Sequence, residues 1–134
     1  MIGLDTNVLV RYLVQDDQTQ ARHASRLIES CTRDEPGFIS IVTLAEVTWV
    51  LKSAYNAGRD EILKVVENLL QTEALVVQMA DVAWKALAVY RAGAADFADC
   101  LIERIGAAHD CVATYTFDQI AARDAGMQLL GSKN

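Results

Sequence analysis

The sequence has little of several features that mark specialised classes of protein. It holds a single proline, Pro36, among 134 residues and no stretch rich in glycine or serine, so we expect one domain over residues 1–134 and no linker. No apolar run approaches the ~18 residues needed to cross a bilayer. The longest candidate, residues 37–45, is interrupted at Glu46. We therefore expect no membrane-spanning segment.

Cysteine is also scarce and shows no pattern. Cys31, Cys100 and Cys111 are odd in number, lack the spacing of metal ligands and have apolar neighbours. No basic segment followed by a long apolar stretch stands near Met1, so we expect no secretory signal. These features predict three small buried thiols in a protein of the reducing cytoplasm.

Glycine-rich nucleotide motifs are missing too. No Gly-x-Gly-x-x-Gly follows any expected strand, which argues against dinucleotide binding. Hydrophobic residues make up 52% of the chain, which excludes an intrinsically disordered protein.

What is present is an alternation of strand-like and helix-like segments. Short β-prone runs predict strands at residues 2–4, 37–41, 74–78, 111–115 and 127–130. The helical segments between them begin with a short helix that has Val8, Leu9, Tyr12 and Leu13 on one face, and a second helix capped by Asp16 or Asp17. Further helices are expected at residues 43–55, 60–72, 80–92, 97–108 and about 118–125.

This alternation predicts an α/β fold, a three-layer α/β/α sandwich with a mainly parallel sheet of about five strands. Such sheets place their sites beyond the carboxyl ends of the strands, where helices begin. Asp5, Glu46 and Asp118 fall at such strand-to-helix junctions, and Asp96 and Asp99 open a helix that leads into the fourth expected strand. We therefore expect these acids to converge on one pocket.

Clustered carboxylates need a partner, because each ionised pair about 4 Å apart costs roughly 4 kcal/mol at an effective dielectric of 20. Hard oxygen ligands of this kind suit Mg²⁺ or Mn²⁺. The net charge of −6 then counts only weakly against a nucleic-acid substrate. With five of the 18 acids in the pocket, the other 13 nearly balance the 12 basic residues.

Each acid also has a structural explanation. Asp5 and Asp118 can cap helices, and the pairs Thr43–Glu46 and Asp96–Asp99 have the spacing of capping boxes. Taken singly, each acid favours a cap, whereas the set favours a site. Asp96 is the exception and fits a cap better.

The same residues, in this order, resemble the PIN-domain family, and specifically the VapC-type toxins of bacterial toxin–antitoxin pairs. The resemblance covers nearly the whole chain in four blocks: residues 4–11, which begin Leu4-Asp5-Thr6-Asn7, residues 43–46, residues 93–102, and Thr114-Tyr115-Thr116-Phe117-Asp118. The Gln119-Ile120 that follows Asp118 departs from many relatives, which carry another charged or aromatic residue there.

The resemblance implies a PIN fold, a homodimer, a Mg²⁺/Mn²⁺-dependent endoribonuclease and a small cognate antitoxin protein as partner. Carried over, Asp5, Glu46, Asp99 and Asp118 match the family's acidic quartet, and Thr6, Asn7, Asp96 and Thr116 match nearby positions that support the metal. Thr116 is expected to bond Asp5 or a metal-bound water.

The expected chemistry is in-line attack of an activated water on a phosphodiester of RNA. Asp5 and Asp99 are the principal expected ligands, and neither His23 nor His109 is needed as a base. Two hypotheses for the arginines carry equal weight: they steer the RNA backbone, or they are scattered surface charges. They are Arg11, Arg91, Arg104 and Arg123.

Three other functions compete with this one. A DNA nuclease of the same fold would use the same acids. A phospho-accepting receiver module is disfavoured, because Thr6-Asn7 follows Asp5, Gln78-Met79-Ala80 follows the third strand, and Lys133 stands too near the end. A non-catalytic binding module would use an apolar surface with Trp49, Val50, Tyr55 and Trp84, although large aromatics at helical spacing more often belong to the core.

Overall fold

The structure is a computed structural model that describes residues 1–131, so Lys133 lies outside the described residues. The chain divides into two compact units, Met1–Ala80 and Asp81–Asn134, each with its own sheet and helices. The expectation of a single domain over residues 1–134 stays a prediction. No helix within residues 1–131 is long and apolar enough to cross a membrane.

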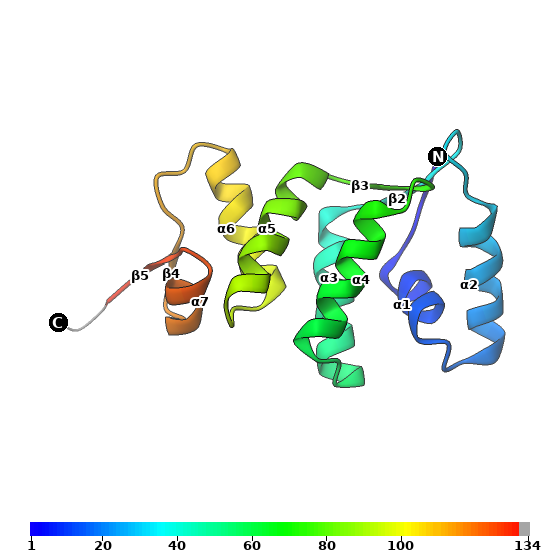
Figure 1. Ribbon diagram of the computed structural model, residues 1–134, viewed down its shortest axis with the longest axis horizontal. Helices are drawn as coiled ribbons and strands as arrows, with labels where there is room; N and C mark the ends of the chain where they lie inside the picture. The colour runs from blue at the N-terminus through cyan, green and yellow to red at the C-terminus, as the bar shows by residue number, and fades with distance from the viewer. Residues whose placement is uncertain (132–134) are drawn as a thin grey trace. The chain divides into compact units, whose positions relative to one another are not determined.

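The first unit is built on a three-stranded parallel sheet (Figure 1). Its strands are β1 (Ile2–Gly3), β2 (Gly37–Ile39) and β3 (Leu75–Val77), in the order β1-β2-β3. The register pairs Gly3 with Phe38 and Ile39 with Val77. The middle strand, β2, therefore has hydrogen-bonded neighbours on both sides.

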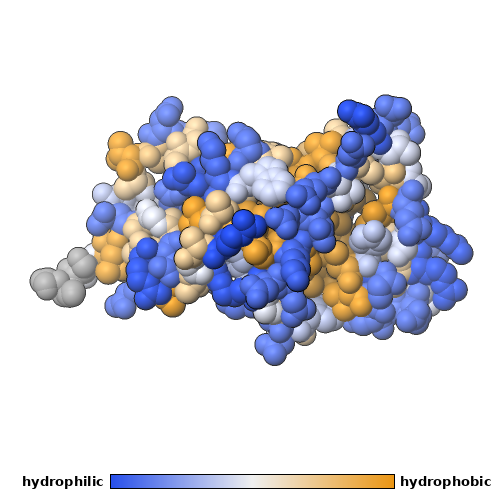
Figure 2. Space-filling view, viewed as in Figure 1, coloured by the Kyte–Doolittle hydropathy of each residue, from blue (hydrophilic) through white to orange (hydrophobic). Residues whose placement is uncertain are grey.

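Four helices form the two crossovers of this sheet. They are α1 (Thr6–Val14) and α2 (Gln18–Ser30) between β1 and β2, and α3 (Ile41–Tyr55) and α4 (Arg59–Gln71) between β2 and β3. Helix α1 packs against α2 and α3, while α4 packs against α3 and β3. The side chains that pack most completely are Leu9, Ile39, Leu44, Val47 and Val66. The outward side chains of α2 are hydrophilic (Figure 2).

Local capping explains where two of these helices begin. Asp17, one of the two expected caps of α2, accepts a hydrogen bond from the backbone N of Gln20 at 3.0 Å. Helix α3 begins two residues earlier than expected, because Ser40 caps it by accepting from the backbone N of Thr43 at 3.1 Å. Thr43 is therefore not the cap, and the expected capping box with Glu46 is wrong.

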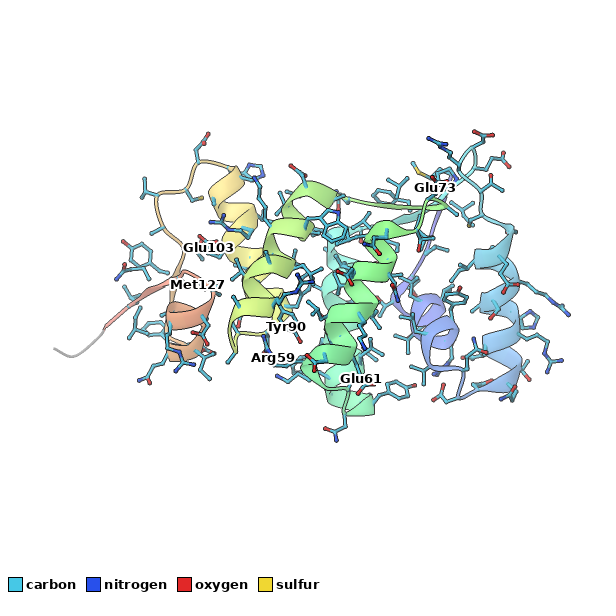
Figure 3. All side chains as sticks on the ribbon, in the orientation of Figure 1. Arg59, Glu61, Glu73, Tyr90, Glu103 and Met127 are labelled. Atoms are coloured by element: carbon cyan, nitrogen blue, oxygen red, sulfur yellow. The ribbon has the colours of Figure 1, made fainter. Side chains whose placement is uncertain are left out.

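The second unit contains α5 (Ala80–Ala92), α6 (Phe97–Ala108), β4 (Tyr115–Thr116), α7 (Gln119–Asp124) and β5 (Gln128–Leu129). Strands β4 and β5 pair in parallel, and α7 connects them and packs on both. The ring of Tyr90 on α5, labelled in Figure 3, meets that of Phe97 edge to face, with centroids 5.8 Å apart. Both side chains are buried, so this aromatic pair joins α5 to α6 in the core of the unit.

The predicted α/β class with parallel strands is confirmed. Within residues 1–131 the sheets are smaller than the expected sheet of about five strands, because three strands pair in the first unit and two in the second. Hydrophobic periodicity locates strands along the chain, whereas the choice of pairing partner depends on contacts between distant segments.

The expected fourth strand begins too early. Residues 111–114 are irregular, because the backbone at the end of α6 forms a Schellman cap. Asp110 adopts a left-handed conformation (φ 64°), its N–H bonds to the carbonyl of Ala107, and the N–H of Cys111 bonds to that of Gly106. Cys31 and Cys100 are buried as expected, but Cys111 is exposed by this turn, which corrects the prediction of three buried thiols.

The two tryptophans lie at the surface rather than in the core. Trp49 is 61% exposed on α3 and Trp84 is 38% exposed on α5. Each stands two positions from a buried valine of its helix, Val47 and Val82. Two positions correspond to about 200° around an α-helix, so both rings point away from the packed face.

Gly37 supplies a direct test of this packing. A Cβ there would lie 2.7 Å from Cδ1 of Leu4, 3.1 Å from Cδ2 of Leu75 and 3.3 Å from Sγ of Cys31. We expect Gly37→Ala to lower the free energy of unfolding by about 1–3 kcal/mol through overpacking. Gly3→Ala is the matched control, because a Cβ at Gly3 meets nothing within 4 Å. Urea denaturation that gives equal losses for the two variants would contradict the packing at β2.

Candidate functional site

Asp5 stands where β1 leads into α1. Leu4 continues the pairing with β2 by donating its N–H to the carbonyl of Phe38 at 2.9 Å, and its side chain is buried. Asp5 then caps α1, with Oδ1 accepting from the backbone N of Thr6 at 2.8 Å. The cap expected for Asp5 is therefore confirmed, and it fixes an exposed carboxylate at the carboxyl end of β1.

Glu46 lies in the second turn of α3 and is tied to α1. The buried hydroxyl of Thr6 donates to Oε1 of Glu46 at 2.6 Å, across 40 residues of sequence. A hydrogen bond to a charged acceptor is among the stronger ones in proteins. Thr6 thus brings the carboxylate of Glu46 to the beginning of the helix that Asp5 caps.

Asn7, the next residue of the first motif, is exposed on α1. It lines a groove of about 310 Å³ between α1 and α2 together with Val8, Arg11, Gln20, His23, Ala24 and Leu27. The polar position expected beside Asp5 thus belongs to the wall of this groove.

In the second unit, Asp96 and Asp99 occupy the beginning of α6. Asp96 is the N-cap residue, as the structural explanation expected, but its side chain makes no capping hydrogen bond. Asp99 stands three positions later in the first turn, and both side chains are half-buried. Residues three apart on a helix face the same side, so the two carboxylates share one face of α6.

Asp118 repeats at α7 the role that Asp5 has at α1. Its Oδ1 accepts from the backbone N of Ile120 at 2.8 Å and of Ala121 at 2.9 Å, so it is a helix cap as well. The backbone N of Asp118 in turn donates to Oγ1 of Thr116 at 3.0 Å. Thr116 therefore orients the turn that carries Asp118.

The structure divides these residues between its two units, and it shows Thr6 in contact with Glu46 and Thr116 in contact with Asp118. Asp5, Thr6, Asn7 and Glu46 belong to the first unit, and Asp96, Asp99, Thr116 and Asp118 to the second. Among residues 1–131, no three His, Cys, Asp or Glu side chains form a group that could hold a metal ion. The convergence of all the acids on one pocket stays a prediction.

The donor set nevertheless fits a hard divalent cation. The candidate ligands are all carboxylates, with no thiol or imidazole among them, as Mg²⁺ and Mn²⁺ prefer. A carboxylate has about four lone-pair sites. Capping through Oδ1 of Asp5 and of Asp118 is therefore compatible with ligation through the second oxygen of each.

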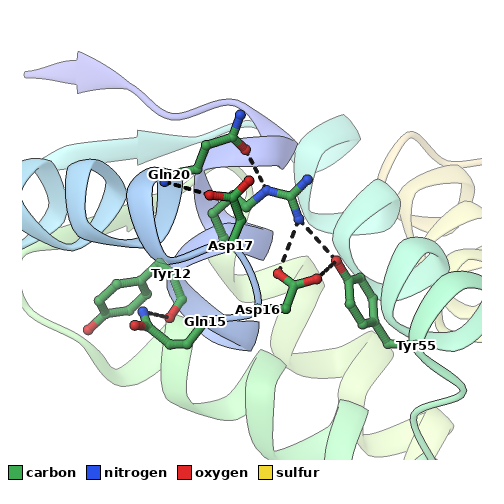
Figure 4. Close-up of polar contacts among 7 residues, drawn as sticks. Tyr12, Gln15, Asp16, Asp17, Gln20 and Tyr55 are labelled. Carbon is green, nitrogen blue, oxygen red and sulfur yellow. Dashed lines mark hydrogen bonds and ion pairs between the residues drawn. The ribbon is translucent and has the colours of Figure 1, made fainter.

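Of the four arginines considered for RNA steering, Arg11 is held in a network (Figure 4). Its Nη1 donates to the hydroxyl of Tyr55 at 3.0 Å and lies 3.3 Å from Oδ1 of Asp16, while its Nε donates to Gln20. The hydroxyl of Tyr55 donates to Oδ2 of Asp16 at 2.9 Å. Arg11 thus joins α1 to α3 and to the α1–α2 loop.

Two other arginines pair with the residue beside them. Arg104 binds Glu103, labelled in Figure 3, at 2.6 Å, and Arg123 binds Asp124 at 2.9 Å. His23 and His109 are both exposed.

Sequence reasoning missed two features of this region. Tyr55 was considered for an interface or the core, whereas its hydroxyl bridges Arg11 and Asp16. The bond between Thr6 and Glu46 was also missed, although both residues were named. Each contact joins residues about 40 positions apart in the sequence, and local sequence patterns do not predict such contacts.

The Thr6 hydroxyl should contribute measurably to the stability of the protein. We expect Thr6→Val to lower the free energy of unfolding by about 1 kcal/mol or more, because the replacement keeps the shape and removes a buried donor. A double-mutant cycle with Glu46→Leu, which removes the acceptor oxygens, measures the coupling between the two side chains. Thr19→Val on the exposed face of α2 is the control. Additive effects of Thr6→Val and Glu46→Leu would contradict the hydrogen bond.

The hydrogen bond of the Tyr55 hydroxyl should make the stability of the protein depend on pH. Its hydrogen bond, helped by the charge of Arg11, holds the pKa of Asp16 below its ordinary value. The stabilisation is therefore present above about pH 4, the ordinary pKa of Asp. It is lost as the pH falls through the lowered pKa.

We expect Tyr55→Phe to raise the pKa of Asp16 in an NMR titration of its carboxyl group. The variant should be less stable than the wild type near neutral pH, and the difference should shrink in acid. Tyr115→Phe in the second unit is the control, and an unchanged titration of Asp16 in Tyr55→Phe would refute the assignment.

Comparison with known proteins supplies the family. Curated proteins give no match to the chain. The family model described as PIN domain matches residues 2–126, which include every candidate acid. This domain is a nuclease-type fold, and its members generally depend on a divalent metal ion. The chain therefore belongs to the PIN domain family.

Proposed function

We propose that this PIN domain is a Mg²⁺- or Mn²⁺-dependent endoribonuclease and the toxin of a toxin–antitoxin pair. The observation that carries the proposal is the arrangement at the end of β1, where Asp5 caps α1 and Thr6 holds Glu46 beside it. A carboxylate pair fixed by the fold, in a family of nucleases, supports metal-dependent hydrolysis of a phosphodiester.

Asp5, Glu46, Asp99 and Asp118 are the proposed ligands of the catalytic cation. A bound Mg²⁺ or Mn²⁺ would lower the pKa of a water and offset charge on the scissile phosphate. Thr6 holds Glu46 through a hydrogen bond, and Thr116 orients the Asp118 turn through its contact with the backbone of Asp118. These two threonines are positioning residues.

Asn7 and Asp96 have supporting roles in this proposal. Asn7 is exposed one position after Thr6, where its amide can donate to a substrate phosphate. Asp96 begins α6 one turn before Asp99 and adds negative charge beside that ligand.

The proposed partners are RNA, a cognate antitoxin protein and a second copy of the chain. Exposed apolar side chains on α3, Val42 (66%) and Trp49 (61%), support association with protein. A small DNA-binding protein encoded in the neighbouring reading frame would support the toxin role. So would growth arrest on expression that Asp5→Asn abolishes.

Cleavage of labelled RNA in Mg²⁺ tests the nuclease assignment. We expect Asp99→Asn and Asp5→Asn each to lower kcat/KM by about 100-fold or more, because each removes a charged ligand. Asp81→Asn in the first turn of α5 and Asp34→Asn in the α2–β2 loop are matched controls, since both acids are exposed and outside the proposed ligand set. Wild-type rates in Asp5→Asn or Asp99→Asn would refute the proposal.

The same assay identifies the nucleic acid. An endoribonuclease cuts single-stranded RNA and leaves a DNA strand of the same sequence intact. Equal cleavage of DNA would contradict the ribonuclease assignment and indicate a DNA nuclease that uses the same acids.

A further inference from the structure

The second unit exposes an aromatic ring directly beside a proposed metal ligand. Phe117 lies between β4 and α7, immediately before Asp118, and is 78% exposed. Tyr115, two residues earlier, is 61% exposed. Exposing a phenyl ring forgoes roughly 1.5–3 kcal/mol of burial, so a ring fixed in solvent beside a candidate site is a candidate for contact with a ligand.

Phe117 forms part of a groove of about 860 Å³ within the second unit. The other lining residues are Gln119, Ala122, Arg123, Leu129, Leu130 and Gly131. The lining combines apolar side chains with an amide and a guanidinium, which distinguishes it from a purely apolar protein-docking surface. The volume lies within the range of pockets that bind small molecules.

The backbone around Phe117 is held on both sides. Thr116 accepts the N–H of Leu130 at its carbonyl and the N–H of Asp118 at its hydroxyl. A Cβ added to Gly131 would lie 3.9 Å from Cε1 of Phe117, so the edge of the ring lies over the backbone of Gly131. Because the backbone that carries the ring is held in this way, little backbone ordering is needed when a ligand stacks on the ring.

Arg123 can contact a phosphate while it keeps its ion pair. Its Nε and Nη2 each donate one hydrogen bond to Asp124, at 2.9 Å. The guanidinium has five N–H donors, so three remain for another acceptor. The side chain is 67% exposed, and the pair with Asp124 holds the guanidinium plane in one orientation.

We propose that Phe117 stacks on an unpaired base of the single-stranded RNA substrate and that Arg123 contacts a neighbouring phosphate, so that these two residues form a substrate-binding surface beside Asp118. This inference rests on the proposed nuclease function. Bases in a duplex have both faces occupied by neighbouring pairs, whereas bases in loops and single strands can stack on aromatic side chains.

Binding of a fluorescein-labelled 12-nucleotide RNA, measured by anisotropy in the Asp5→Asn background, tests the stacking. Phe117→Ala should weaken binding of the single strand by about 5- to 150-fold, the range found for one stacked base. Phe117→Trp should retain the affinity, and Phe117→Leu should lose it, because leucine is apolar but has no π face. The same RNA annealed to its complement should bind weakly and show no dependence on residue 117.

The phosphate contact has a separate signature. Arg123→Gln should reduce the slope of log affinity against log salt concentration by about 0.7, the value for one phosphate contact on a single strand. Phe117→Ala should leave that slope unchanged. Val112→Ala is the matched control, because Val112 is fully exposed in the same unit and does not line the groove.

The outcomes separate this inference from the nuclease assignment. Full affinity in Phe117→Ala, with RNA cleavage by the wild type intact, overturns the stacking and leaves the assignment standing. Full affinity in Phe117→Leu also overturns it, and indicates an apolar contact such as a protein partner makes. Binding that depends on Phe117, without metal-dependent cleavage by the wild type, supports the stacking and contradicts the nuclease assignment.

Discussion

The close packing over Gly37 is the constraint on which the first unit depends. Leu4, Cys31 and Leu75 fill the space that a side chain at residue 37 would occupy, so β2 lies tightly between β1 and β3. The resulting register places Gly3 opposite Phe38, and the two strands end side by side. Their following helices, α1 and α3, therefore begin next to each other. The Thr6–Glu46 hydrogen bond is a consequence of this register.

Helix capping and the candidate chemistry use the same residues. Asp5 and Asp118 each cap a helix through one carboxylate oxygen, and Asp96 stands at the N-cap of α6. A cap fixes the orientation of the side chain through its hydrogen bond to the helix backbone. The structural and the functional explanations of these acids are therefore compatible, and the family match adds the reason for their order along the chain.

Particular elements show which features of the fold were predictable from the sequence. Helices α4, α5 and α6 were predicted within a residue or so, because their apolar periodicity is strong, and Asp17 was among the expected caps. The fourth strand begins later than predicted because of the Schellman cap at Asp110. In this cap the N–H groups of Asp110 and Cys111 bond to carbonyls of α6 instead of a neighbouring strand. The sequence left Trp49 and Trp84 open between a binding surface and the core, since hydrophobic character alone does not reveal which face of a helix is packed. The structure exposes both side chains.

The sequence by itself determined the α/β class, the parallel strands, the family and the acids that are candidates for the site. These follow from periodicity and from motifs a few residues long, which local backbone preferences express. The tertiary structure decided that the strands within residues 1–131 pair as a set of three and a set of two, that Thr6 reaches Glu46, and that Tyr55 joins Arg11 to Asp16. It also placed Phe117 in solvent beside Asp118. Each of these features depends on which distant segments pack together, and local sequence patterns do not predict those tertiary contacts.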